Sequence, residues 1–77
     1  MEKYVKAIES VISLMIYWMK EQKCTPEESL RRWGGRLSGI IEVAIYDTAL
    51  NQDEFRALQI LIRDEKIIER LEGNNDK

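Results

Sequence analysis

The sequence contains no histidine and only one cysteine, Cys24, among its 77 residues. A single thiol excludes an intramolecular disulfide, and a zinc site made of one cysteine and carboxylates would be unusual. Cys24 precedes an expected helix start, where the helix dipole can lower a thiol pKa. The chain nevertheless offers no imidazole to act as the base for this thiol. We therefore expect no catalytic residue, no metal and no cofactor, and a protein that is not an enzyme.

Long hydrophobic runs are also missing. The longest apolar stretch, residues 11–19, is interrupted at Ser13 and is far shorter than the ~20 residues of a membrane-spanning helix. The stretch is followed by KEQKC instead of a small-residue cleavage site, which is not typical of a signal peptide. A free thiol without an export signal favours a reducing compartment. We expect a cytoplasmic protein that does not enter a membrane.

An excess of charge of one sign is absent as well. The chain carries 12 basic and 14 acidic residues, a net charge of −2, and no segment is basic enough to form a nucleic-acid-binding tail. A domain of this length buries only about 60% of the surface of its unfolded chain and is marginally stable alone. Disulfides, metals or a second subunit usually stabilise such domains. A homodimer is the remaining option, although the sequence does not distinguish a dimer from a higher oligomer.

Helix boundaries are marked at two places. Thr25 and Glu28 form a capping-box pattern, with the single proline, Pro26, at the first helical position. Asn51 and Glu54 repeat the pattern. No alternating pattern indicates a strand, so the sequence predicts an all-α single domain over residues 1–72, with helices at about 3–22, 26–48 and 52–72 and a frayed tail at 73–77. The expected architecture is a helical hairpin plus a third helix, a three-helix bundle completed by homodimerisation.

Three of the four glycines fall within the segment RRWGGRLSG, residues 31–39. A glycine in a helix interior costs about 1 kcal/mol relative to alanine. An apolar stripe from Leu30 to Ala44 nevertheless continues through the segment, which favours one helix over a break at Gly34-Gly35. Gly35 and Gly39 lie opposite this stripe, where another backbone could approach closely. The alternative is that these glycines are tolerated on a solvated face.

The first helix is apolar over an arc of roughly 200°, wider than the ~100° that a surface helix needs. The excess is expected to contact a second copy of the chain. The predicted self-association surface combines this arc with the glycine face of the second helix: Val11, Leu14, Trp18, Gly35, Gly39 and Tyr46.

Asp64 falls in the middle of the apolar face that the third helix is expected to place in the core. This face consists of Ala57, Ile60, Leu61, Ile67, Ile68 and Leu71. A buried carboxylate requires a partner. Arg32 or Arg36 is the expected partner, in a buried ion pair between helices or between subunits. The alternative is an apolar face that is split at Asp64, with the carboxylate in water.

The third helix also carries a basic stripe at helical spacing. Its members are Arg56, Gln59, Arg63, Lys66 and Arg70. The stripe is interpreted as a partner-binding surface for a larger protein; a nucleic-acid-binding regulator and a merely solvated face are the alternatives. No motif is specific to a family. Taken together, the sequence predicts a regulator, adaptor or inhibitor that acts by binding a larger protein. Its size and composition are common among phage and mobile-element products.

Overall fold

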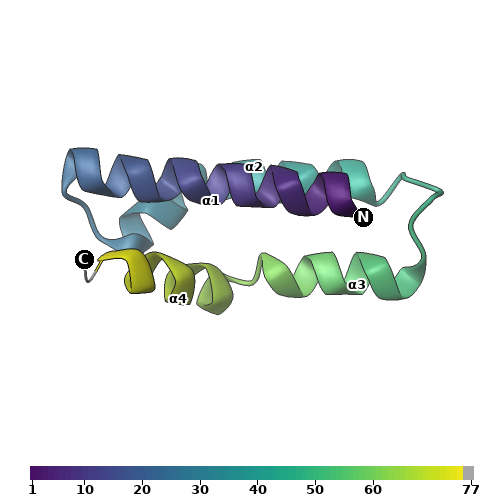
Figure 1. The fold of residues 1–77 in the computed structure, drawn as a ribbon. Helices are drawn as coiled ribbons and strands as arrows, with labels where there is room; N and C mark the ends of the chain where they lie inside the picture. Colours follow the sequence, from purple (N-terminus) through teal and green to yellow (C-terminus); the bar gives the residue numbers. More distant parts are fainter. Residues whose placement is uncertain (76–77) are drawn as a thin grey trace.

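The computed structural model describes residues 1–75 of the chain, and this part is all-helical, as predicted. Four helices follow one another, at Glu2–Gln22 (α1), Pro26–Ala44 (α2), Gln52–Leu61 (α3) and Asp64–Asn75 (α4). Figure 1 shows α1 and α2 as an antiparallel hairpin, with α3 and α4 end to end along one side of it. The resulting rod measures 40 × 17 × 17 Å.

The turn between α1 and α2 forms where the sequence predicts it. Lys23 adopts the left-handed conformation (φ 52°, ψ 46°) that ends α1, and its N–H bonds to the Met19 carbonyl. Thr25 and Glu28 then form the predicted capping box, with Pro26 in the first turn of α2. These bonds satisfy backbone groups at both helix ends, which fixes the hairpin.

The α2 helix runs without a break through all three glycines, which confirms the continuous helix. It ends at Ala44, however, and not near residue 48 as predicted. The cause is Asp47, whose carboxylate accepts hydrogen bonds from the Ala49 N–H at 2.9 Å and from the Tyr4 hydroxyl. Such local side-chain bonds compete with helix formation, and here they tie the α2–α3 loop to the start of α1.

The predicted third helix is two helices, so the expectation of a three-helix chain was wrong in this respect. Asn51 and Glu54 form the predicted capping box of α3, but the helix ends before Ile62, which lies at φ −102° and ψ 10°. A new helix begins at Asp64, with acidic side chains in its first turn, where the helix dipole favours them. Gly73 does not stop this helix, which continues to Asn75. The rest of the predicted tail, 76–77, lies outside the described residues.

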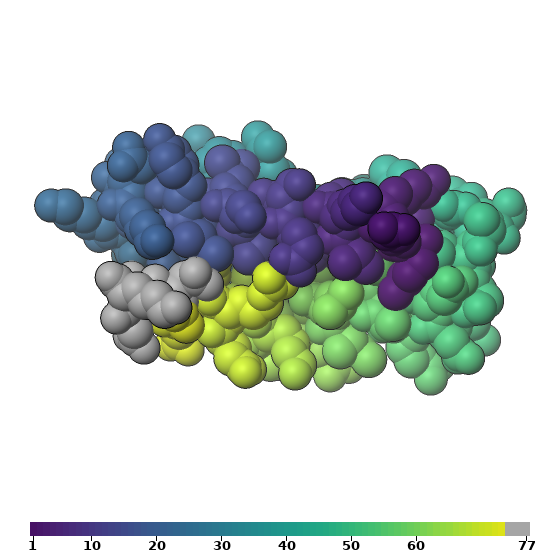
Figure 2. Space-filling view, viewed as in Figure 1, coloured from purple at the N-terminus to yellow at the C-terminus, as the bar shows by residue number. Residues whose placement is uncertain are grey.

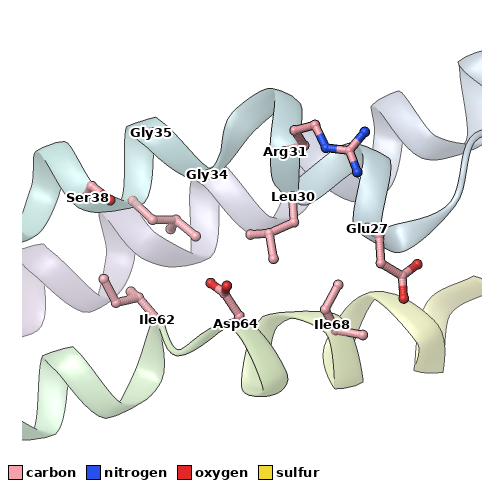
Figure 3. A pocket seen from close by; sticks show the side chains of 10 residues that line it. Glu27, Leu30, Arg31, Gly34, Gly35, Ser38, Ile62, Asp64 and Ile68 are labelled. Atoms are coloured by element: carbon pink, nitrogen blue, oxygen red, sulfur yellow. The ribbon is translucent and has the colours of Figure 1, made fainter.

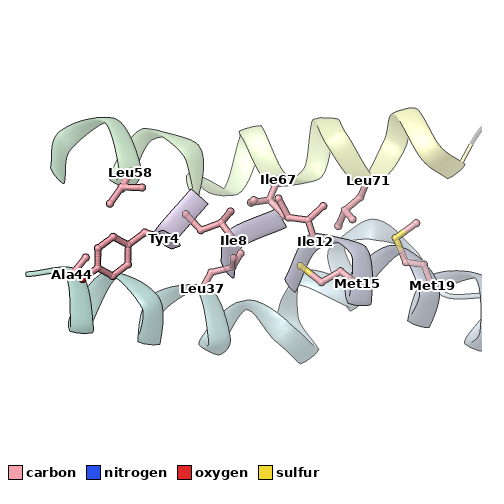
Figure 4. Close-up of a cluster of buried hydrophobic side chains, with 10 residues drawn as sticks. All are labelled: Tyr4, Ile8, Ile12, Met15, Met19, Leu37, Ala44, Leu58, Ile67 and Leu71. Carbon is pink, nitrogen blue, oxygen red and sulfur yellow. The ribbon is translucent and has the colours of Figure 1, made fainter. Parts of the chain in front are cut away.

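The core lies between the hairpin and the α3–α4 pair, as Figure 4 shows. Full burial of one such side chain contributes about 1.5–3 kcal/mol. In α3 the buried residue is Leu58, whereas Ile60 and Leu61, expected in the core, are 40% and 39% exposed. Because the helix is interrupted, its inward face differs from that of the continuous helix we predicted. The ten core residues are Tyr4, Ile8, Ile12, Met15, Met19, Leu37, Ala44, Leu58, Ile67 and Leu71.

Candidate protein-interaction surfaces

The junction of α3 and α4 carries a hollow of about 350 Å³ lined by exposed apolar and charged side chains. Ile60 and Leu61 supply its apolar part, while Lys66, Glu69 and Arg70 supply the charged part. All five residues of the predicted basic stripe are exposed in the structure: Arg56, Gln59, Arg63, Lys66 and Arg70. The interruption at residues 62–63 divides the stripe between two helices, so it is not one continuous helix face.

Arg70 differs from the other members of the stripe because it bonds to α1. Its two terminal nitrogens donate to both carboxylate oxygens of Glu9, at 2.8 and 2.6 Å. This bidentate pair lowers the pKa of the Glu9 carboxyl, chiefly through the hydrogen bonds. Figure 2 shows α1 lying directly against α4 on the side where the pair joins them. Part of the positive charge of Arg70 is therefore compensated within the chain.

A second apolar surface is a groove of about 720 Å³ between α1 and α2. Its described lining residues come from these two helices alone, so α3 and α4 leave it uncovered. Tyr4, Ala7 and Val11 lie on the α1 side; Gly39, Ile40 and Val43 lie on the α2 side. Val43 is 64% exposed, and Tyr46, just beyond the end of α2, is 85% exposed.

Only some of the predicted self-association residues line this groove. Val11 and Gly39 line the groove, while Leu14 and Trp18 are half-buried further along α1. Gly35 is exposed and lines a different pocket, and Tyr46 lies in the turn after α2. A Cβ atom added at Gly35 or Gly39 would meet nothing within 4 Å outside its own helix. The packing of one chain therefore does not require glycine at either position.

Trp33 lies between the two arginines that were expected to pair with Asp64. The guanidinium carbons of Arg32 and Arg36 lie 5.2 and 4.8 Å from the centre of a Trp33 ring, a cation–π geometry. The Trp33 ring also meets Trp18 edge to face, at 6.2 Å between centroids. The indole N–H of Trp33 is buried without a hydrogen-bond partner among the described residues.

The expected ion pair of Asp64 does not form within the chain. Asp64 is exposed, because α4 begins there and places it in a first turn instead of a helix interior. No ion pair joins it to Arg32 or Arg36 in the described part of the structure. An ion pair between subunits stays a prediction. Figure 3 shows the Asp64 carboxylate turned toward α2, in a pocket of about 550 Å³ that has Leu30 and Gly34 on the opposite side.

Reactive groups are few. Cys24 is half-buried, and its burial, together with the nearby Glu28 carboxylate, raises the pKa of its thiol. The position of Cys24 before α2 suggested that the helix dipole lowers the thiol pKa, but this is not the dominant effect. The Tyr4 hydroxyl donates to Asp47, which lowers the pKa of that carboxyl, and the Lys3 ammonium lies 3.4 Å away from it. This cluster anchors a loop, and sequence reasoning missed it because its members are 43 positions apart.

Two kinds of feature are absent from residues 1–75. No group of three or more acidic, cysteine or histidine side chains in this part could hold a metal ion. None of the four helices is long and apolar enough to cross a lipid bilayer. In the comparisons with known proteins, no family model, no curated protein and no solved structure matches this chain.

Proposed function

We propose that this chain is a non-enzymatic protein that forms a homodimer and acts as a regulator, adaptor or inhibitor by binding a larger protein. The observation that carries the proposal is the hollow at the α3–α4 junction. There, Ile60 and Leu61 are two-fifths exposed beside Lys66. Apolar side chains with a charged rim are the usual anatomy of a protein interface.

The expected partner segment carries a bulky apolar side chain with carboxylates beside it. The apolar side chain would enter the hollow between Ile60 and Leu61. The carboxylates would meet Lys66 and the exposed Arg63, which forms no ion pair among the described residues. Complementary charges of this type speed association and select the partner more than they add affinity.

A protein partner is favoured over nucleic acid for two reasons. Arg70 is paired with Glu9, and the Glu69 carboxylate lines the hollow at the α3–α4 junction. The positive charge of the stripe is therefore partly compensated. A surface that follows a phosphate backbone needs several uncompensated cations, and its affinity falls steeply with salt.

The proposal is tested by selecting ligands from a displayed library of random peptides and mapping them by NMR on the isotope-labelled chain. We expect selected peptides that combine acidic and bulky apolar residues, and shifts centred on Ile60, Leu61 and Lys66. Lys66→Glu should weaken binding at least about tenfold, a change of ~1.4 kcal/mol. Lys20→Glu, an exposed lysine on α1, is the matched control and should have no effect.

Two outcomes would overturn the proposal. One is a set of selected peptides that lack acidic residues, or that shift the NMR signals of residues on other surfaces. The other is binding of duplex DNA or RNA that falls with salt and is abolished by Arg63→Glu, which would support the nucleic-acid-binding regulator instead.

A further inference from the structure

The open groove between α1 and α2 continues onto a face of α2 that is largely exposed. At 100° per residue, positions 35, 39 and 43 fall within one sector of α2, and Tyr46 follows in the turn just beyond the helix end. Here the two glycines leave open space, whereas Val43 and Tyr46 project as the most exposed apolar side chains of the described residues. The face therefore carries both depressions and projections.

The spacing of these features is symmetric about Gly39. Gly35 and Val43 are each four positions from it, and Arg36 and Glu42 are each three positions from it. If a second α2 crosses the first in the opposite direction at Gly39, Gly35 lies opposite Val43 of the partner subunit. In the same register, Arg36 lies opposite Glu42 of the partner subunit. Both contacts occur twice, as a two-fold interface requires.

The charges near the middle of α2 also favour an antiparallel pair. The first turn is acidic at Glu27 and Glu28 and is followed by Arg31 and Arg32, while Arg36 and Glu42 flank Gly39. An antiparallel copy crossing at Gly39 places Arg36 opposite Glu42, whereas a parallel copy would align each with its own like charge.

The size of this side of the rod suits a dimer interface. The long side spans 40 by 17 Å. A standard interface buries ~800 Å² of each partner, so the contact would have to extend from α2 over the neighbouring groove. The groove beside Gly39, lined by Val11 and Ile40, would be covered by the same contact.

We propose that two copies of this chain associate through antiparallel α2 helices that cross at Gly39, with Val43 of each copy placed over Gly35 of the other. This inference rests on the homodimer proposed above and specifies its interface. It also explains two glycines that the packing of one chain does not need. In this arrangement the hollow at the α3–α4 junction stays free for a different protein.

The first test is the mass in solution, by light scattering on a sizing column, across a dilution series of the full chain. We expect the wild type and Gly73→Leu to have the mass of a dimer, and Gly39→Leu to raise the dimer dissociation constant more than about tenfold. Gly73 is the matched control, because an added Cβ there also meets nothing within 4 Å. Circular dichroism checks that Gly39→Leu keeps its helix content.

The second test reverses charges and fixes the register. Arg36→Glu and Glu42→Arg should each weaken the dimer, and the double variant should restore it, because the opposite charges face each other again. The Arg36–Trp33 contact is lost in Arg36→Glu and in the double variant alike, so recovery of the double variant relative to Arg36→Glu reports the pair across the interface.

The possible failures are distinguishable. A wild type that is monomeric at all concentrations overturns both the homodimer and this interface, and leaves the groove open to another protein. A wild-type dimer that tolerates Gly39→Leu, or whose double variant is no better than the singles, keeps the homodimer and overturns this interface.

Discussion

The two sides of α1 have similar amino acids in different surroundings. On the inner side, Ile8, Ile12 and Met15 are at most 1% exposed, because α1 packs against both α2 and α4. On the outer side, Val11, Leu14 and Trp18 are only half-buried. One layer formed by α3 and α4 is thus enough to close one side of the hairpin but not both. Apolar character alone does not reveal which side of a helix the chain itself will cover.

The largest expected effect is the loss of a buried side chain on the inner side of α1, compared with the loss of one on its outer side. Ile12→Ala should lower the free energy of unfolding by about 2–5 kcal/mol, because it opens a cavity in a closed core. Val11→Ala, in the groove that the proposed dimer covers, should cost less at high dilution. In a dimer its cost should increase with protein concentration, since association adds stability by mass action. Urea denaturation at several protein concentrations measures both. Equal, concentration-independent losses would contradict the distinction between the sides.

A smaller effect is expected where α1 meets α2 near the hairpin turn. Ser29 is fully buried, and its hydroxyl donates to the Met15 carbonyl at 2.9 Å. Ser29→Ala should cost about 1 kcal/mol relative to Ser38→Ala, an exposed serine on the same helix that corrects for helix propensity. Chemical denaturation of both variants gives the difference. If both behave alike, the buried hydrogen bond does not contribute to the closed side.

Features that depend on neighbouring residues were predictable from the sequence. Both capping boxes, at Thr25 and at Asn51, were confirmed, because each needs only residues three apart. The continuity of α2 through its glycines was confirmed as well, because the apolar stripe outweighs the low helix propensity of glycine. The side chains of the predicted basic stripe are exposed, as expected, but they do not lie on one helix face.

Features that depend on distant residues were not predictable in the same way. Beyond the early end of α2, Asp47 bonds to the nearby Ala49 N–H and also to the Tyr4 hydroxyl, and no local pattern contains the second bond. The interruption after Leu61 lacks glycine and proline, so its one signal was a charged residue, Asp64, on an apolar face. That signal was interpreted either as a buried ion pair or as a split apolar face with the carboxylate in water; Asp64 is exposed at the start of α4, in agreement with the second interpretation. The exposed Ile60 and Leu61 follow from this interruption and were assigned to the core.

The smallest expected effect concerns the ion pair that closes the covered side, between Glu9 and Arg70. Because the pKa of Glu9 is lowered in the folded chain, its contribution is complete above the unfolded pKa of about 4.3 and is lost as pH falls through the folded pKa. The two side chains are 50% and 43% exposed, which limits the contribution to about 0.5 kcal/mol.

Glu9→Gln should therefore be about 0.5 kcal/mol less stable than the wild type at pH 7, and equally stable in strong acid. Thermal unfolding between these pH values measures the difference. Glu72→Gln, an exposed α4 residue that forms no ion pair within residues 1–75, is the control and should show no such trend. One molar salt should reduce the Glu9 difference, because screening weakens exposed pairs. A difference that persists unchanged in acid would mean that the carboxylate charge does not hold α4 against α1.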